Sequence, residues 1–128
     1  MILDSSALVA IIFQEPGYEI LLKKLADAET IGIGTPTLVE SGLVLSARLN
    51  QDARGLLARF LEEANVTTIP FTEAHFGTAV GACLKYGKGR HPAALNFGDC
   101  LAYATARLAG MPLLYVGDDF PQTDLRLA

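Results

Sequence analysis

The sequence predicts an α/β fold: a three-layer α/β/α sandwich around a central parallel sheet. Short apolar segments alternate with longer amphipathic ones, and helical patterns separate each strand candidate from the next. Strands that are joined through helices run parallel, and their sheet is covered on both faces by right-handed crossovers. In such sheets ligands bind beyond the carboxyl ends of the strands, where the strand order reverses.

The predicted strands are short apolar runs, and the predicted helices carry apolar residues three and four positions apart. The strands are expected at 2–4, 30–34, 66–71 and 112–117. The helices are expected at 7–13, 15–29, 35–50, 52–65, 72–87 and 96–110. Thr35 is the expected cap of the third helix, with Pro36 as its first residue. Asn96 caps the last helix, Gly110 ends it, and 88–95 is expected to form a polar loop.

Length and composition indicate one domain over residues 1–128. The chain is 51% hydrophobic and 19% charged, which suits a compact core rather than disorder. No apolar run approaches the ~20 residues of a membrane span, and the first residues lack the basic region of a signal peptide. A cytoplasmic protein without membrane contact is therefore expected, with Cys83 and Cys100 as free thiols.

The net charge of −4 argues against a general nucleic-acid coat protein, because such proteins neutralise phosphates with basic patches. It is compatible with an enzyme that binds nucleic acid through a local basic loop and a bound metal. The segment "KYGKGRHP" is such a loop, with Lys85, Lys88, Arg90 and His91. We expect Lys88, Arg90 and His91 to form a substrate-binding rim that contacts phosphates.

Carboxylates stand where predicted strands end and predicted helices begin. Asp4 ends the first strand, Glu40 lies early in the helix after the second, and Asp99 lies in the first turn of the last helix. Asp118 and Asp119 follow the last strand directly. All these positions project to one edge of a parallel sheet, so the acids are expected to converge there.

Each acid alone also has a purely structural interpretation. Glu40 completes a capping-box pattern with Thr37, Asp99 suits the dipole of its helix, and Asp4 could cap the helix that Ser5 begins. Together, however, clustered carboxylates repel one another unless a cation joins them. Mg²⁺, or alternatively Mn²⁺, is the expected cofactor, because hard divalent ions prefer oxygen ligands and support phosphodiester hydrolysis.

Four stretches resemble one known family over nearly the whole chain. They are "ILDSSALVAII", "PTLVESGLVL", "KYGKGRHPAALNFGDCLAYA" and "PLLYVGDDFPQTDL". They are similar to PIN-domain ribonucleases, specifically the VapC toxins of type II toxin–antitoxin pairs. The resemblance implies a Mg²⁺- or Mn²⁺-dependent endoribonuclease that acts on RNA, forms a homodimer and is blocked by a VapB-like antitoxin.

The resemblance also assigns roles to particular residues. Asp4, Glu40 and Asp99 match three catalytic, metal-binding acids of the family. The fourth acid follows the last strand, where "GDDF" leaves Asp118 and Asp119 in competition; Asp118, the first after the strand, is favoured. Ser6 matches a small polar residue beside the first acid, expected to bond a metal-bound water or a carboxylate.

Other classes fit the residues less well. A haloacid dehalogenase-type phosphotransferase needs a second aspartate where Ser6 stands, and a receiver domain needs a lysine after its last strand. "GIGTPT" has only part of a dinucleotide-binding glycine motif and lies at the second strand. A binding module without catalysis remains the alternative, and stabilisation by divalent metal separates the two. The predicted helices over 15–29 and 35–50 also carry more apolar residues than one buried face needs, which indicates a protein partner.

Overall fold

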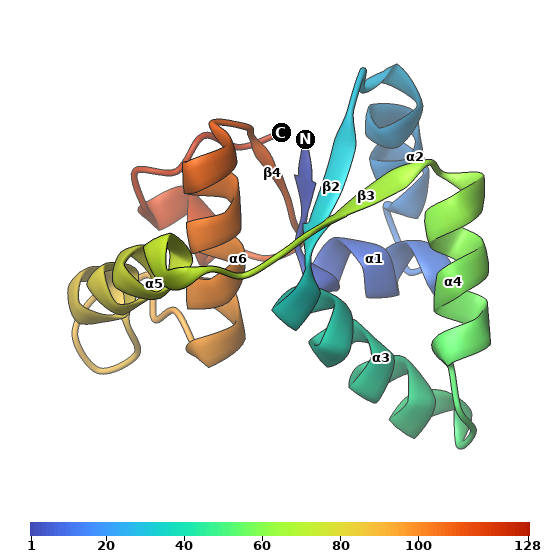
Figure 1. Cartoon of the computed structure of the whole chain (residues 1–128), viewed down its shortest axis with the longest axis horizontal. Coiled ribbons are helices and arrows are strands. Elements are labelled where there is room, and N and C mark those ends of the chain that lie inside the picture. Colours follow the sequence, from blue (N-terminus) through green and yellow to red (C-terminus); the bar gives the residue numbers. More distant parts are fainter.

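The computed structural model describes residues 1–128 and has the predicted α/β/α architecture (Figure 1). The strands are β1 (Ile2–Leu3), β2 (Ile31–Gly34), β3 (Val66–Ile69) and β4 (Leu113–Leu114). The helices are α1 (Ser5–Ile12), α2 (Tyr18–Asp27), α3 (Thr35–Leu49), α4 (Arg54–Glu63), α5 (Glu73–Tyr86) and α6 (Phe97–Ala109), with a short 3₁₀ turn at Phe120–Gln122. Every predicted strand and helix is present, and most are a few residues shorter than expected.

The four strands form one parallel sheet in the order β3-β2-β1-β4. From β1 the chain adds β2 and β3 on one side and later returns to add β4 on the other. The strand order therefore reverses at β1, whose carboxyl end is the expected ligand-binding position. Figure 1 shows α1 to α4 on one side of the sheet and α5 and α6 on the other.

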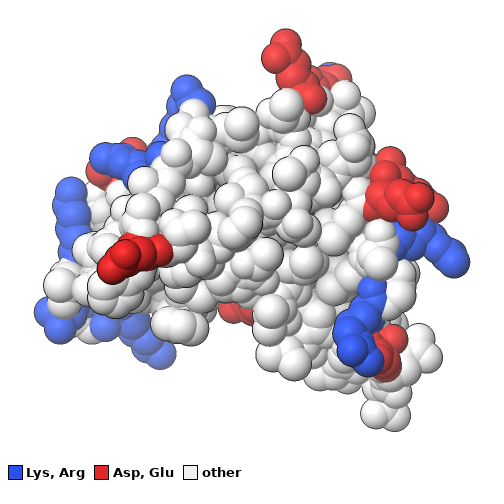
Figure 2. All heavy atoms as spheres, in the orientation of Figure 1, with Lys and Arg blue, Asp and Glu red and all other residues white.

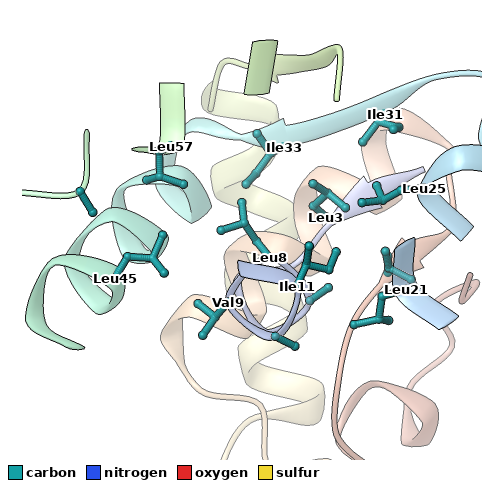
Figure 3. Close-up of a cluster of buried hydrophobic side chains, with 14 residues drawn as sticks. Leu3, Leu8, Val9, Ile11, Leu21, Leu25, Ile31, Ile33, Leu45 and Leu57 are labelled. Atoms are coloured by element: carbon teal, nitrogen blue, oxygen red, sulfur yellow. The ribbon is translucent and has the colours of Figure 1, made fainter. Parts of the chain in front are cut away.

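Two hydrophobic cores lie on the two faces of the sheet. The first packs β1 and β2 against α1 to α4, and Figure 3 shows its side chains, among them Leu3, Leu8 and Leu45. The second packs β1 and β4 against α5 and α6 around Ile2 and Tyr103. Because side chains alternate along a strand, consecutive residues of β1 serve different cores.

The helix starts differ from the sequence prediction at two places. α1 begins at Ser5, two residues before the expected range 7–13, and Asp4 is its N-cap, as the structural interpretation of this acid predicts; the Asp4 side chain accepts the Ser6 backbone N–H. Gly34, not Thr35, precedes α3, so Pro36 is inside the first turn rather than at its start. Extended backbone at Gly34 lets β2 run directly into α3. Here the strand, not a capping side chain, sets where the helix begins.

Cys83 and Cys100 form a disulfide, so the prediction of free thiols is wrong. Cys83 lies on α5 and Cys100 on α6, and their Cα atoms are 5.8 Å apart. This separation lies within the range that a disulfide spans. The two cysteines are 17 residues apart in the chain, and only the packing of α5 against α6 brings them together. None of the helices is both long and apolar enough to cross a membrane.

Candidate active site

Asp4 lies at the carboxyl end of the central strand and is almost wholly buried, with 2% of its surface exposed. Its Oδ2 accepts hydrogen bonds from the backbone N–H and the hydroxyl of Ser6. Its Oδ1 is buried without any partner. Burial raises the pKa of Asp4, and the negative charge of Glu40 adds to the rise, while the bonds from Ser6 oppose it. A buried carboxylate oxygen without a partner is unfavourable unless something binds it.

Two adjacent serines tie this acid to its surroundings. The Ser5 hydroxyl donates to Glu40 Oε1 at 2.6 Å and so joins α1 to α3. The Ser6 hydroxyl donates to Asp4 and accepts the backbone N–H of Val116 at 2.9 Å. The predicted carboxylate partner of Ser6 is therefore present, and Ser6 also links the segment after β4 to the site.

Glu40 is not part of a capping box, which was its structural interpretation. Because α3 begins at Thr35, Thr37 lies inside the helix, where its hydroxyl oxygen is buried without a partner. The Glu40 carboxylate instead lies against the start of α6. A Cβ added to Gly98 would collide with Glu40 Oε2 and lie 2.9 Å from Oε1. Only a glycine lets α6 approach this carboxylate so closely.

Asp99 combines both roles considered for it. It forms a capping box with Asn96: its backbone N–H donates to Asn96 Oδ1 at 2.9 Å, and its own Oδ2 accepts the Asn96 N–H at 3.0 Å. Burial raises the pKa of Asp99 to about 6, against the effect of the Asn96 bond. The charges of Asp4, Asp119 and Glu40 contribute to this rise. Carboxylates from four separate segments are therefore close enough at this edge of the sheet for their charges to repel one another.

Asp118 and Asp119 are both exposed after β4. The charge of Asp119 contributes to the raised pKa of Asp99, and Asp118 is not among the contributors. The backbone carbonyl of Asp118 accepts a bond from the Gln122 side chain at 3.2 Å. The electrostatics therefore favour Asp119, not Asp118, as the acid of this segment that faces the cluster.

The predicted basic rim is a loop held at both ends. The Lys88 backbone N–H donates to the Leu95 carbonyl, and the Leu95 N–H donates back to the Tyr86 carbonyl. Lys88 and Arg90 are exposed, whereas His91 is half-buried. The ring Nδ1 of His91 accepts the backbone N–H of Ala93 at 3.0 Å, and the His91 ring packs perpendicular to the ring of Tyr86. His91 therefore orders the loop, while the two cations remain available.

The charges of this face lie mostly at its periphery. Figure 2 shows Lys and Arg side chains gathered along one side, over α5, the loop after it and the C-terminal segment. The middle of the same face is almost free of charged groups. A polyanion would be attracted along that side of the molecule despite the net charge of −4.

The acidic cluster suits a divalent cation by its donor chemistry rather than by a preformed coordination geometry. No three His, Cys, Asp or Glu side chains are already close enough together to hold an ion as they stand. The donor chemistry nevertheless fits, because all the converging groups are carboxylates and Asp4 Oδ1 is buried without a partner. A cation would relieve both this unpaired oxygen and the mutual repulsion that helps raise the pKa of Asp99.

Two residues of the site were not singled out from the sequence. The sequence points to Ser5 only as the first residue of a helix, yet its hydroxyl holds Glu40. Gly98 was not considered, although it sets how closely α6 approaches that acid. A glycine in the first turn of a helix lowers helix propensity. Such a glycine, immediately before an acid, is the signal that could have indicated close packing.

The fold and the acidic edge place the chain in a known class, and comparison with known proteins agrees. A family model described as PIN domain matches residues 1–125. The chain belongs to the PIN domain family.

Several named proteins are similar to it over nearly their whole lengths. Ribonuclease VapC36 of Mycobacterium tuberculosis is 47% identical over 126 residues, covering 98% of this chain and 91% of that protein. Ribonuclease VapC of Mycolicibacterium smegmatis is 38% identical over 125 residues, with 98% and 97% covered.

Solved structures share the fold at low identity. The crystal structure of VapC20 from Mycobacterium tuberculosis, described as a Sarcin-Ricin loop cleaving toxin, has a TM-score of 0.79 at 15% identity. It covers 99% of this chain and 97% of that one. VapBC2 from Rickettsia felis, bound to a DNA fragment from its promoter, has a TM-score of 0.76 at 20% identity, with 99% and 96% covered.

Proposed function

We propose that this protein is a metal-dependent endoribonuclease and the toxin of a type II toxin–antitoxin pair. The observation that carries the proposal is the convergence of Asp4, Glu40 and Asp99 from three elements onto one edge of the sheet, with Asp4 Oδ1 buried and unpaired. The names of the most similar relatives, all ribonucleases of the VapC type, support the reaction class.

The acids would hold Mg²⁺ or Mn²⁺. Asp4, Glu40 and Asp99 supply anionic oxygens, and Asp119 is the better candidate than Asp118 for the fourth. A bound divalent ion would supply a water of lowered pKa and stabilise the charge that develops on the phosphate.

The remaining residues position these acids and the substrate. Ser6 fixes the Asp4 carboxylate, Ser5 fixes Glu40, and the Asn96 N–H holds one oxygen of Asp99. Lys88 and Arg90 are exposed on the loop before α6, where they can neutralise RNA phosphates. The proposed site contains no histidine that acts as a general base.

The test is cleavage of RNA by purified protein in Mg²⁺, in Mn²⁺ and in EDTA, with Asp4→Asn as the inactive variant. Glu73→Gln is the matched control, because Glu73 is an exposed acid in the first turn of α5 rather than α6. We expect cleavage only with metal, loss by orders of magnitude in Asp4→Asn, and wild-type rates in Glu73→Gln. Mapping RNA ends after brief expression in cells identifies the RNA. Metal-independent cleavage, or cleavage by Asp4→Asn at the wild-type rate, contradicts the proposal.

The proposed setting is the cytoplasm, with a VapB-like antitoxin and a second copy of the chain as partners. Large apolar side chains are exposed on the predicted partner surface, among them Ile20 on α2 and Val39 and Leu43 on α3. Val39 and Leu43 also line a groove of about 680 Å³ between α3 and α4. Exposed apolar area of this kind favours a protein partner. Co-purification with the protein encoded beside this chain tests for the antitoxin. The molar mass of this chain in solution tests for the homodimer. A monomer that binds no such protein contradicts both proposed partners.

A further inference from the structure

A second groove, of about 700 Å³, opens beside the acids and shares Val39 and Leu43 with the groove between α3 and α4. It lies between α3 and the start of α6, at the carboxyl edge of the sheet, and Phe71 closes it from the segment after β3. Its apolar walls include Phe97, Phe71, Val39, Leu43 and Leu101. No lysine or arginine lines it, so it is not built for a phosphate. Its size is that of pockets that hold small organic groups.

Phe97 is the most conspicuous residue of this groove. It is the first residue of α6, and 77% of its surface is exposed, more than any other large apolar side chain here. A phenylalanine that exposed adds almost nothing to the core. Phe71, by contrast, is half-buried and packs against His75 in a tilted arrangement, with 5.1 Å between ring centroids. The groove thus contains one exposed aromatic ring, that of Phe97, and one that is fixed by packing, that of Phe71.

The groove and the acidic edge share a wall. Glu40 and Gly98 line the groove, and the same Glu40 carboxylate is held by Ser5 beside Asp4. Asp99 follows Gly98 directly. A flat group that enters the groove therefore lies next to whatever the acids hold.

An unpaired nucleobase matches these features. Single-stranded nucleic acids are bound by stacking bases on aromatic side chains, because every base has an apolar π-face. The phosphate attached to that base would point toward the acids and away from the apolar walls of the groove. Glu40 is the single charged group in the lining, and its carboxylate is placed where a base edge could donate hydrogen bonds to it.

We propose that Phe97 is a substrate-binding residue that stacks on an unpaired base next to the scissile phosphate, and that this contact contributes to the choice of cleavage site. This inference rests on the proposed ribonuclease activity and adds the subsite at which one base is held. The competing occupant is an apolar segment of a protein partner, and the experiments below separate the two.

Fluorescence gives a direct test, because the chain contains no tryptophan. Phe97→Trp places one tryptophan in the groove, and Phe76→Trp places one on α5 at a phenylalanine that is also exposed (63%) but does not line the groove. Each variant is titrated with a 2′-O-methyl RNA, which cannot be cleaved, chosen from the mapped cut site. We expect quenching of the Phe97→Trp signal only. An RNA with an abasic position beside the scissile phosphate should bind with little quenching. Equal quenching by intact and abasic RNA, or in both variants, overturns the proposal.

Kinetics provide the second readout. Loss of one stacked base corresponds to roughly 1–3 kcal/mol, so Phe97→Ala should lower kcat/KM about 5- to 150-fold, with Phe97→Tyr near wild type. Cleavage should also spread to neighbouring positions in Phe97→Ala, while Phe76→Ala keeps the wild-type pattern. If the wild type cleaves RNA and Phe97→Ala cleaves it at the same rate and positions, the subsite is wrong while the ribonuclease stands. If only the molar mass or partner binding of Phe97→Ala changes, the groove is a protein interface and the proposal fails. If the wild type cleaves no RNA, the function itself fails.

Discussion

Replacing Asp99 by asparagine is expected to stabilise the metal-free protein at neutral pH. The new side chain keeps an oxygen for the Asn96 N–H, so the capping box survives. What disappears is a carboxylate whose pKa is raised from 3.8 to about 6, mainly by burial. That shift corresponds to ~3 kcal/mol, which solvent screening of the partly exposed group reduces to ~1–2 kcal/mol. Loss of the helix-dipole interaction removes ~0.3–1 kcal/mol. A net gain of ~1 kcal/mol raises Tm by a few degrees.

The gain should depend on pH with a definite sign. Because the folded-state pKa of Asp99 lies above its value of 3.8 in the unfolded chain, the stabilisation that this carboxyl gives is present below 3.8 and lost as pH rises through about 6. The advantage of Asp99→Asn is therefore largest at pH 7 and disappears near pH 4. Urea unfolding in EDTA at both pH values measures it, and Mn²⁺ should reverse the order by stabilising only the wild type.

Glu73→Gln is the control for a helix-start acid without acidic neighbours, and it should lose a few tenths of a kcal/mol at pH 7. If Asp99→Asn is destabilised in EDTA at pH 7 as much as Glu73→Gln or more, the reasoning is wrong. Asp99 would then be a favourable helix charge rather than a member of a repelling cluster.

Three further changes follow from contacts in the structure. Gly98→Ala should push the Glu40 carboxylate aside and lower RNA cleavage more than tenfold with little change in Tm, since the end of a flexible side chain yields easily; an unchanged rate would show that this carboxylate is dispensable. Reduction of the Cys83–Cys100 disulfide should lower the free energy of unfolding by about 3 kcal/mol, and the double serine variant should melt alike with and without reductant. Ser6→Ala should lose roughly 1–3 kcal/mol in urea unfolding, because it removes the hydroxyl that donates to the buried Asp4 carboxylate and accepts the Val116 backbone N–H.

The fold could be predicted almost completely from the sequence because its signals are local and agree with one another. Helical periodicity, the Asn96 cap and the Gly110 stop all define α6 at its observed bounds. The errors arose where tertiary structure overrode a local pattern. Thr37 and Glu40 match a capping box, but α3 begins at Thr35 directly after β2, as its expected range 35–50 predicts, so Thr37 lies inside the helix and cannot cap it.

The site could be predicted at the level of which acids converge, since strand ends and helix starts share one edge of a parallel sheet. Contacts across elements were beyond the sequence. The bond from Ser5 to Glu40 joins residues 35 positions apart, and the cysteines meet only through helix packing. The choice between Asp118 and Asp119 depends on the direction of a turn, which no spacing rule fixes.

Ile2 and Leu3 are neighbours in β1, yet they belong to two separate cores. Glu40 is carried by a helix of the first layer and Asp99 by a helix of the second. The distance between these two carboxylates therefore depends on how the two helical layers pack against a sheet of four strands. A cavity made under either layer would shift one acid against the other while the chain stays folded. Cleavage should accordingly fail at lower urea concentrations than secondary structure does, so activity reports on interlayer alignment before global unfolding begins.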